Sequence, residues 1–319
     1  MIEDASGLLR RCTFPPAGSV LTCAVSGGPD SMALLALATL AGCRVRAVHV
    51  DHGLREGSAV EAEVVARAAA FLGAGFQAER VDVEPGPNLE ARARAARFEV
   101  LPPDVATGHT MDDQAETVLC NLLRGAGLDG LAAMRGGPAH PLLGIRRSEA
   151  RAICEELCEE SGLQWVEDPS NEDPRHLRNR VRHELLPMCA EVAGRDPVPL
   201  LARLADLAAS DAELLDALAS QTLPDPSVAA DLARLPESLA GRAVRRWLRT
   251  LGATPSAGGR PSATRGSDRH PPSLSEVRRV LAVASGGAVA TELAGGWRVR
   301  RSRGRLIATA PGDARREGP

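Results

Sequence analysis

The stretch SGGPDS, residues 26–31, decides how the first half of this chain is organised. Apolar runs at residues 20–25 and 32–40 flank it, which predicts a buried strand, a tight turn and a helix. At such a turn the first N–H groups of the helix point toward a ligand, and two glycines let the backbone approach an anion closely. The hydroxyl groups of Ser26 and Ser31 add donors. We therefore predict a phosphate-binding loop.

Strand and helix signals alternate over roughly the first 190 residues. Strands are expected at 20–25, 45–50, 76–83 and 105–108, and helices at 32–40, 59–72, 89–101, 112–123 and 149–161. This alternation predicts an α/β fold with a doubly wound, mostly parallel sheet that carries helices on both faces. Ligands of such sheets bind beyond the carboxyl ends of the strands, where the loops 26–31, 49–55 and 108–113 fall.

The composition changes near residue 197. Helices are expected at 200–223, 228–251 and 274–284, and a β-hairpin at 288–308 that turns near Ser302, Arg303 and Gly304. Residues 253–273 are rich in Gly, Pro, Ser, Thr and Arg without an apolar period, which predicts a flexible insertion. We therefore expect two domains, an α/β domain at 1–195 and a smaller, mainly helical domain at 196–319 that ends in the hairpin.

Composition narrows the class of protein. Hydrophobic residues make up 44% and charged residues 25% of the 319 positions, as in ordinary globular proteins. All 38 basic residues are arginine, so a catalytic lysine is excluded. The net charge of −3 confines any nucleic-acid contact to local arginine patches. Seven cysteines without a C-x-x-C pair, and no secretory or membrane segment, indicate free thiols in the cytoplasm.

Two further loops carry candidate site residues. His49 and Asp51 are two apart on a strand and face the same side. A zinc site is one interpretation, but no third ligand with zinc-site spacing follows, so a nucleotide-facing loop or a polar cap on the sheet is favoured. Asp113 and Glu116 share one face of a helix and indicate a site for Mg²⁺ or a substrate ammonium, or a capping box with Thr110.

Arginines gather in three segments. They are Arg92, Arg94 and Arg97; Arg175, Arg178, Arg180 and Arg182; and Arg298, Arg300, Arg301, Arg303 and Arg305. Such clusters are either solvated faces or phosphate-binding surfaces, because a guanidinium group holds phosphate oxygens bidentately. Beside a phosphate loop they suggest a second polyanion such as RNA.

Five segments, in this order, resemble the tRNA(Ile)-lysidine synthases, a family of ATP pyrophosphatases with a PP-loop. They are SGGPDS at 26–31, HVDHGLR at 49–55, A-R-x-x-R at 93–97, the run from HTMDDQAET onward at 109–134, and EDPSNEDPRHLRNRVRHELLP at 167–187. The first segment is shared by all ATP pyrophosphatases, and the last two are far more specific. Phe98 stands where the family usually has Tyr, and His140 stands where it usually has Arg.

The resemblance implies an activity. ATP would adenylate C2 of the cytidine at the first anticodon position of a CAU-reading tRNA(Ile), and the ε-amine of free L-lysine would then attack C2 and expel AMP. This is a ligase reaction that forms a carbon–nitrogen bond. The resemblance leaves a homodimer open.

The resemblance also implies roles for particular residues. ATP would be bound by Ser26, Gly27, Gly28, Pro29, Asp30, Ser31, His49 and Asp51, with Asp30 near a Mg²⁺ ion held through the phosphates. Asp113 and Glu116 would bind lysine through its ammonium groups, and His109 or a carboxylate would accept a proton. The catalytic candidates are Asp30, His109, Asp113 and Glu116. The tRNA-binding candidates are Arg94, Arg97, Arg178, Asn179, Arg182, Arg300 and Arg303.

Two alternatives stay open at this level. A PP-loop tRNA thiolase would also adenylate a pyrimidine such as cytidine, but its chemistry generally needs paired cysteines, which this chain lacks. A non-catalytic nucleotide-binding regulator would need the phosphate loop, but neither the acidic helix nor the EDPSN segment. AMP and pyrophosphate formation that depends on both lysine and tRNA distinguishes the synthase from the regulator.

Overall fold

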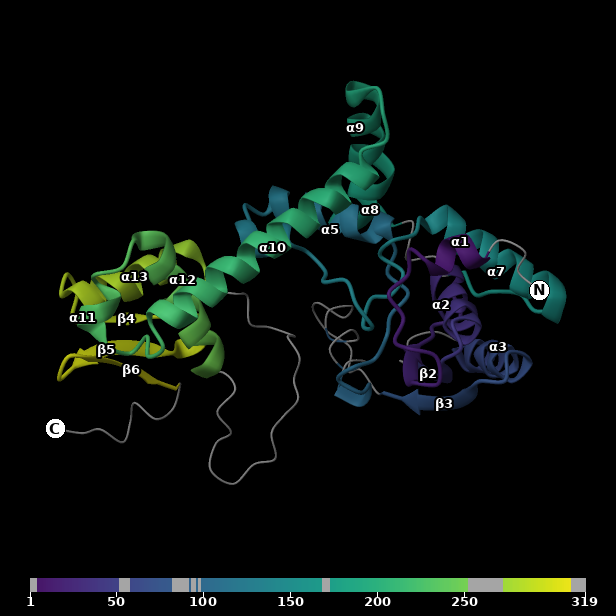
Figure 1. Ribbon diagram of the computed structural model, residues 1–319, viewed down its shortest axis with the longest axis horizontal. Coiled ribbons are helices and arrows are strands. Elements are labelled where there is room, and N and C mark those ends of the chain that lie inside the picture. The colour runs from purple at the N-terminus through teal and green to yellow at the C-terminus, as the bar shows by residue number, and fades with distance from the viewer. Residues whose placement is uncertain are drawn as a thin grey trace. The chain divides into compact units, whose positions relative to one another are not determined.

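The structure is a computed structural model that describes residues 5–51, 58–81, 92, 96, 99–167, 173–251 and 272–310 (Figure 1). The chain forms two compact units, Met1–Ala209 and Ser210–Pro319. The boundary falls inside α10 (Val198–Thr222), later than the division expected at 195/196, because this helix runs unbroken past that point. No helix in the described part of the chain is both long and apolar enough to cross a membrane.

A parallel sheet forms the centre of the first unit. Its strands are β1 (Val20–Ala24), β2 (Arg44–Asp51) and β3 (Gly75–Arg80), in the order β1-β2-β3. The strand expected at 105–108 is only a single parallel bridge between Ala106 and Cys23, on the other edge of β1. The chain thus adds partners on both sides of β1, which makes the carboxyl end of β1 the switch point where ligands bind.

Three helices share one core with this sheet: α2 (Pro29–Leu40), α3 (Ser58–Phe71) and α7 (Arg147–Ser161) (Figure 1). The middle of α2 is buried on all sides, and Cys154 and Cys158 of α7 lie in the same core, as expected for buried thiols. On the opposite face Val48 packs against Leu101 and Val105. The helix expected at 89–101 lies mostly outside the described residues.

Five short elements surround the carboxyl end of the sheet or extend from it. They are α5 (Met111–Leu123), α6 (Leu128–Leu131), α8 (Leu177–Arg180), a π-helical turn η2 (Val181–Leu185) and α9 (Leu186–Ala193). The apolar side of α5 packs against Val181 and Leu186. The N-terminal helix α1 (Ala5–Leu9) packs on α2. The α5 and α8–η2 helices are therefore held side by side near the sheet edge.

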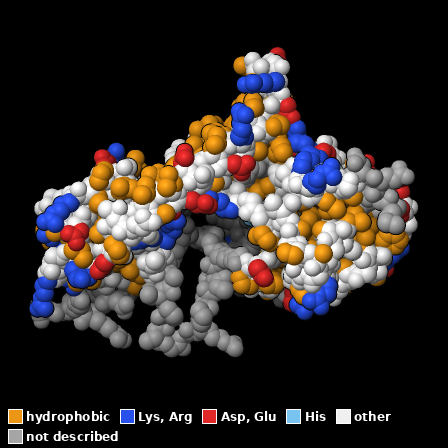
Figure 2. Space-filling model, in the orientation of Figure 1, with side chains coloured by type: hydrophobic (Ala, Val, Ile, Leu, Met, Phe, Trp, Pro, Cys, Tyr) orange, Lys and Arg blue, Asp and Glu red, His pale blue; other side chains and the backbone are white. Residues whose placement is uncertain are grey.

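The second unit contains α11 (Ala229–Leu232), α12 (Glu237–Leu251), α13 (Leu274–Ser285), a 3₁₀ turn η3 (Ala294–Gly296) and the strands β4 (Ala290–Glu292), β5 (Arg298–Ser302) and β6 (Arg305–Thr309). The expected hairpin is confirmed: β5 and β6 pair antiparallel and turn at Arg303 and Gly304, which have positive φ angles. The helix expected at 228–251 is instead two helices, because Pro236 interrupts it. Basic and acidic side chains are interspersed over the face of this unit shown in Figure 2.

Candidate active site

The phosphate loop is held in a fixed shape by its own hydroxyl groups. Ser26 N–H donates to Ser31 Oγ (3.2 Å), and the Ser31 hydroxyl donates to the carbonyl of Gly28 (2.9 Å). Gly27 has φ +92°, and a Cβ there would lie 2.9 Å from Val166 Cγ2, so glycine is required. Helix α2 starts directly afterwards, at Pro29. The loop thus presents a helix N-terminus with no rearrangement, as phosphate binding needs.

A cavity of about 460 Å³ lies at the carboxyl end of β1, in the first unit. Its described lining joins the phosphate loop to parts of β2, the loop before α5, α7 and α8–η2; the residues are Ala24, Val25, Ser26, Gly28, Pro29, Asp30, Ser31, Val48, Val50, Leu101, Thr107, Gly108, His109, Asp113, Arg147, Arg151, Arg178, Asn179 and Arg182. Segments that are far apart in the sequence therefore meet at the switch point of the sheet.

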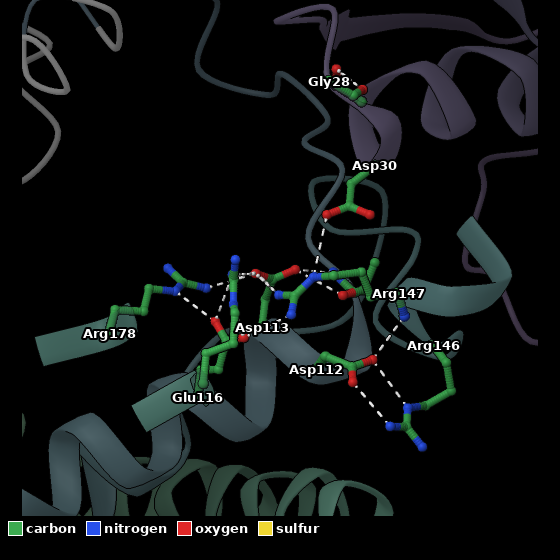
Figure 3. A network of polar contacts seen from close by, with 11 residues as sticks. Gly28, Asp30, Asp112, Asp113, Glu116, Arg146, Arg147 and Arg178 are labelled. Atoms are coloured by element: carbon green, nitrogen blue, oxygen red, sulfur yellow. Dashed lines mark hydrogen bonds and ion pairs between the residues drawn. The ribbon is translucent and has the colours of Figure 1, made fainter. Parts of the chain in front are cut away.

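Glu116 is the centre of a cluster of ionised groups. Its side chain is fully buried, and both oxygens accept from arginines: Oε1 from Arg147 Nη1 (2.8 Å) and Arg182 Nε (2.7 Å), and Oε2 from Arg178 Nε (2.9 Å) and Arg182 Nη2 (3.1 Å). We call Asp113, Glu116, Arg147, Arg178 and Arg182 the acid–arginine cluster (Figure 3).

Asp113 completes this cluster. Its Oδ1 accepts from Arg147 Nη2 (2.9 Å) and Arg178 Nη2 (2.8 Å), and its Oδ2 accepts from the N–H and the hydroxyl of Thr110 (both 2.8 Å). Burial by itself raises the pKa of Asp113, but the charges of the two arginines outweigh it and hold that pKa well below its usual range. The pKa of Glu116 is lowered in the same way, against the effect of burial. Asp113 therefore caps α5 and binds arginines at once.

The spacing of Arg178 and Arg182 explains how two arginines reach one carboxylate. Arg178 lies in α8 and Arg182 in the π-helical turn η2 that follows it directly, and residues four apart on a helical segment lie on one face. Arg147 comes from the first turn of α7, on the other side of the cavity lining. Three separate backbone elements thus converge on two acids of α5.

Asp30 has a different environment at the loop end of the cavity. Its Oδ2 is 3.6 Å from Arg147 Nε, and its buried Oδ1 has no hydrogen-bond partner. Burial and then the charge of Asp113 raise the pKa of Asp30 to about 6, because Arg147 compensates only in part. An under-compensated carboxylate oxygen suits a cation. The described residues contain no group of three His, Cys, Asp or Glu that could hold a metal ion.

Asp112 lies on α5 beside these acids but binds elsewhere. Its oxygens accept from Arg146 Nε and Nη2 (both 3.0 Å) and from the backbone N–H of Arg147 (2.8 Å). Arg146 also pairs with Asp196. Asp112 therefore fixes the start of α7 and so positions Arg147, and it is not a member of the acid–arginine cluster.

His109 lines the cavity next to an unusual neighbour. The Thr107 hydroxyl oxygen is 2.7 Å from His109 Nδ1 and 2.8 Å from His140 Nδ1. The two imidazole rings are 5.2 Å apart and almost perpendicular. His140, which stands where the family usually has Arg, is thus connected to His109 through the hydroxyl group of Thr107.

The other expected site residues are placed as follows. Val48 and Val50 of β2 line the cavity, whereas His49 between them is buried, with its Nδ1–H donating to the carbonyl of Val25 (2.9 Å). Asp51 is not among the described lining residues. Asn179 lines the cavity with Arg178 and Arg182, and donates to the carbonyl of Asp173. Arg300 and Arg303 lie in the second unit on β5 and its turn, and Arg94, Arg97 and Phe98 lie outside the described residues.

Three polar lining residues were not identified from the sequence: Thr107, Arg147 and Arg151. Arg147 is 31 residues from Glu116 and 34 from Asp113, so no local spacing connects them. The helix was expected to begin only at residue 149, so no signal in the sequence indicated Arg147. Arg151, one turn further along α7, stacks over the ring of Trp165 at 5.3 Å.

Comparison with known proteins gives a consistent result. Residues 8–189 match the PP-loop domain family. A tRNA(Ile)-lysidine synthase from Salinispora tropica is 42% identical over 328 residues, which covers 94% of this chain and 93% of that protein. One from Mycobacterium leprae is 42% identical over 275 residues, covering 79% and 84%. A solved U34-tRNA thiolase from Methanococcus maripaludis, with its 4Fe–4S cluster, gives a TM-score of 0.48 at 16% identity over 64% of this chain and 78% of that chain, too distant to assign a function.

Proposed function

The chain belongs to the tRNA(Ile)-lysidine synthase family of PP-loop proteins, and we propose that its cavity catalyses ATP-dependent lysidine formation on tRNA(Ile). We assign this reaction to the cytoplasm. ATP adenylates C2 of the first anticodon cytidine of a CAU-reading tRNA(Ile), and the ε-amine of free L-lysine displaces AMP. Residues 1–195 carry the chemistry and residues 196–319 bind tRNA.

The phosphate loop holds the triphosphate of ATP. The ordered hydroxyls of Ser26 and Ser31 and the N-terminus of α2 face the cavity where the phosphates would lie. Asp30 holds Mg²⁺ together with the phosphates, because its buried Oδ1 has no other partner. When bound, Mg²⁺ would neutralise charge on the phosphate oxygens. His49 supports the loop through its hydrogen bond to the carbonyl of Val25, the residue just before the loop, and Asp51 is the last residue of β2.

Lysine binds at the acid–arginine cluster. Every carboxylate oxygen of Asp113 and Glu116 already accepts from an arginine or from Thr110, so an ammonium group must take the place of a guanidinium group. We assign that exchange to Arg147, which also lies 3.6 Å from Asp30 and so can turn toward the phosphates. Lysine binding would then move one positive charge toward the phosphates of ATP.

The tRNA binds through arginines of both units. The cavity that receives the cytidine is lined by Arg178, Asn179 and Arg182. The sugar–phosphate backbone of the tRNA is contacted by Arg300 and Arg303 of the second unit. Arg94 and Arg97 belong to the same proposal. A homodimer is compatible with this arrangement.

The observation that carries this proposal is one cavity whose described lining combines the phosphate loop, four members of the acid–arginine cluster (Asp113, Arg147, Arg178 and Arg182) and the imidazole of His109. A thiolase would need reactive cysteines there. None of the seven cysteines is among the described residues that line the cavity, and burial raises the pKa of the Cys23 thiol to about 12.

The test is incorporation of labelled L-lysine into CAU-anticodon tRNA(Ile) with ATP. We expect AMP, pyrophosphate and labelled tRNA in equal amounts, and no AMP or labelled tRNA when lysine, ATP or tRNA is omitted. A CAU-reading methionine tRNA is the matched control and should accept no label. Lysine-independent transfer of sulfur, or ATP binding without AMP release, would refute the proposal.

A further inference from the structure

One hydroxyl group lies between two imidazole rings at the back of the cavity. Thr107 Oγ1 is within hydrogen-bond distance of Nδ1 of both His109 and His140. Backbone hydrogen bonds fix the arrangement: Thr107 N–H donates to the carbonyl of Ala139 (3.0 Å), and His140 N–H donates to that of Gly137 (2.9 Å). The three side chains are therefore held together by the fold and not by a chance rotamer.

Counting protons restricts the two rings. A hydroxyl group has one proton to donate and lone pairs to accept with. The third neighbour of Thr107 Oγ1 is the carbonyl oxygen of Ala139, at 3.3 Å, which can only accept. Whichever neighbour receives the hydroxyl proton, at least one imidazole must donate from Nδ1. That ring, when neutral, has a free lone pair on Nε2.

We propose that His109 accepts a proton from the lysine ε-ammonium and that Thr107 and His140 carry its charge away; this rests on the proposed function. The ammonium N–H bond breaks and its proton joins Nε2 of His109. The Nδ1 proton of His109 moves to Thr107 Oγ1, and the hydroxyl proton moves to Nδ1 of His140. The amine is then neutral and free to attack C2, His109 is neutral with its tautomer exchanged, and His140 is an imidazolium.

The imidazole of His109 lies among charges of both signs. It shares the cavity with Asp30 and Asp113 and with Arg147, Arg178 and Arg182, and its charge lowers the pKa of Asp113. The carboxylates favour a positive charge on this ring and the three guanidinium groups oppose it. The relay returns His109 to its neutral state, so the ring does not remain a fourth positive group beside those guanidinium groups. An arginine at position 140 could donate to Thr107 but never accept a proton, so the imidazole adds a capacity at this position.

The first test measures single-turnover lysidine formation against pH at saturating ATP and lysine. His140→Gln keeps a hydrogen-bonding group but takes no proton, and Thr107→Val removes the hydroxyl. We expect each to lower the rate about tenfold at pH 7, with the loss shrinking at higher pH because more lysine amine is already neutral. Thr107→Ser restores the hydroxyl and should recover most of the rate lost in Thr107→Val. His183→Gln, at an exposed histidine of η2, is the matched control that should keep the wild-type profile. Imidazole in the buffer should rescue His140→Ala but not Thr107→Val.

The second test does not depend on activity. Nitrogen NMR of ¹⁵N-histidine in the free protein should show the Nδ1–H tautomer for His109 and the Nε2–H tautomer for His140, and Thr107→Val should change them; the Nδ1–H tautomer on His140 would overturn the relay. If the wild-type protein forms no lysidine, the proposed function fails. If it does, and His140→Gln and Thr107→Val keep the wild-type rate and pH profile, the relay is wrong. Tautomers that do not respond to Thr107→Val would overturn it in either case.

Discussion

The two ends of the cavity treat their carboxylates in opposite ways. At the phosphate loop, Asp30 keeps one buried oxygen without a partner, and burial raises its pKa to about 6. At α5, Asp113 and Glu116 have donors on every oxygen, and their pKa values are lowered although burial opposes this. Arg147 connects the two ends, because its guanidinium group pairs with Asp113 and Glu116 and also lies near Asp30.

This difference distinguishes a carboxylate that stabilises the fold from one that can bind a ligand cation directly. Burial is common to all three acids, so burial alone does not mark a cation site. What differs is the number of donors that meet each carboxylate oxygen. An acid with an unmet oxygen binds a new cation directly, whereas an acid already paired must exchange one cation for another. The following predictions test that distinction.

Asp30→Asn should lower AMP release with lysine and tRNA by about 100-fold or more, because it removes the charge that faces the phosphates. The same substitution at Asp129, an exposed acid of α6, is the matched control and should be neutral. The rates are measured at saturating ATP. AMP release close to that of the wild-type protein would remove Asp30 from the reaction.

Glu116→Gln should lower the free energy of unfolding by about 3 kcal/mol, because it leaves buried arginines without their counter-charge. Glu184→Gln is the control: Glu184 pairs with Arg180 at 3.1 Å but is 56% exposed, so its substitution should change the free energy of unfolding far less. Urea denaturation measures both.

The same Glu116 variant should raise the KM for lysine about tenfold or more, with ATP binding little changed, because a charge-assisted contact to the ammonium is lost. An unfavourable stability change with an unaltered KM would mean that the cluster only supports the fold. The lysine would then bind elsewhere in the cavity.

The pH dependence of stability should differ in sign between the two ends. Asp30 has a folded-state pKa of about 6 against an ordinary value of 3.8, so the stability that its proton contributes is complete below pH 3.8 and lost as the pH rises through 6. Relative to Asp30→Asn, the wild-type protein should thus weaken by about 2–3 kcal/mol between pH 4 and 7. Glu116 has a lowered pKa, so its contribution is present above pH 4.5 and is lost on acidification. Urea midpoints of both variants across this range measure the two trends, and parallel trends would contradict the comparison.

The sequence predicted the parts of this site that depend on neighbouring residues. The loop at 26–31 and the capped start of α5 follow from residues a few positions apart, and the structure has both. The sheet edge at 105–108 was overestimated, since an apolar run does not tell a strand from a single bridge. The break between α11 and α12, where Pro236 directly precedes the start of α12, was also missed.

The acid–arginine cluster could not be predicted as a unit. Its members come from α5, α7 and α8–η2, and only the tertiary fold brings Arg147 to Asp113. The sequence identified the acids and the arginines separately, and Arg178 and Arg182 were assigned to tRNA binding. Which arginine is paired with a buried acid, and which faces solvent, depends on contacts that no local pattern contains.

The smallest effect is expected at the arginines of the β5–β6 hairpin, which lack the buried acids of the acid–arginine cluster. Arg301 donates to the carbonyl of Ala284 and Arg305 pairs with Asp225; Arg300 and Arg303 are the two hairpin residues proposed above for phosphate contacts. The double variant Arg300→Ala with Arg303→Ala should raise the Kd for tRNA a few-fold and lower its salt slope by about one unit for each lost contact. ATP binding, which depends on the loop of the first unit, should not change. Arg234→Ala, which removes an 80% exposed arginine paired with Asp231, is the matched control. Equal tRNA affinity and an equal salt slope in the double variant would confine RNA contacts to the first unit and make the hairpin arginines a solvated surface.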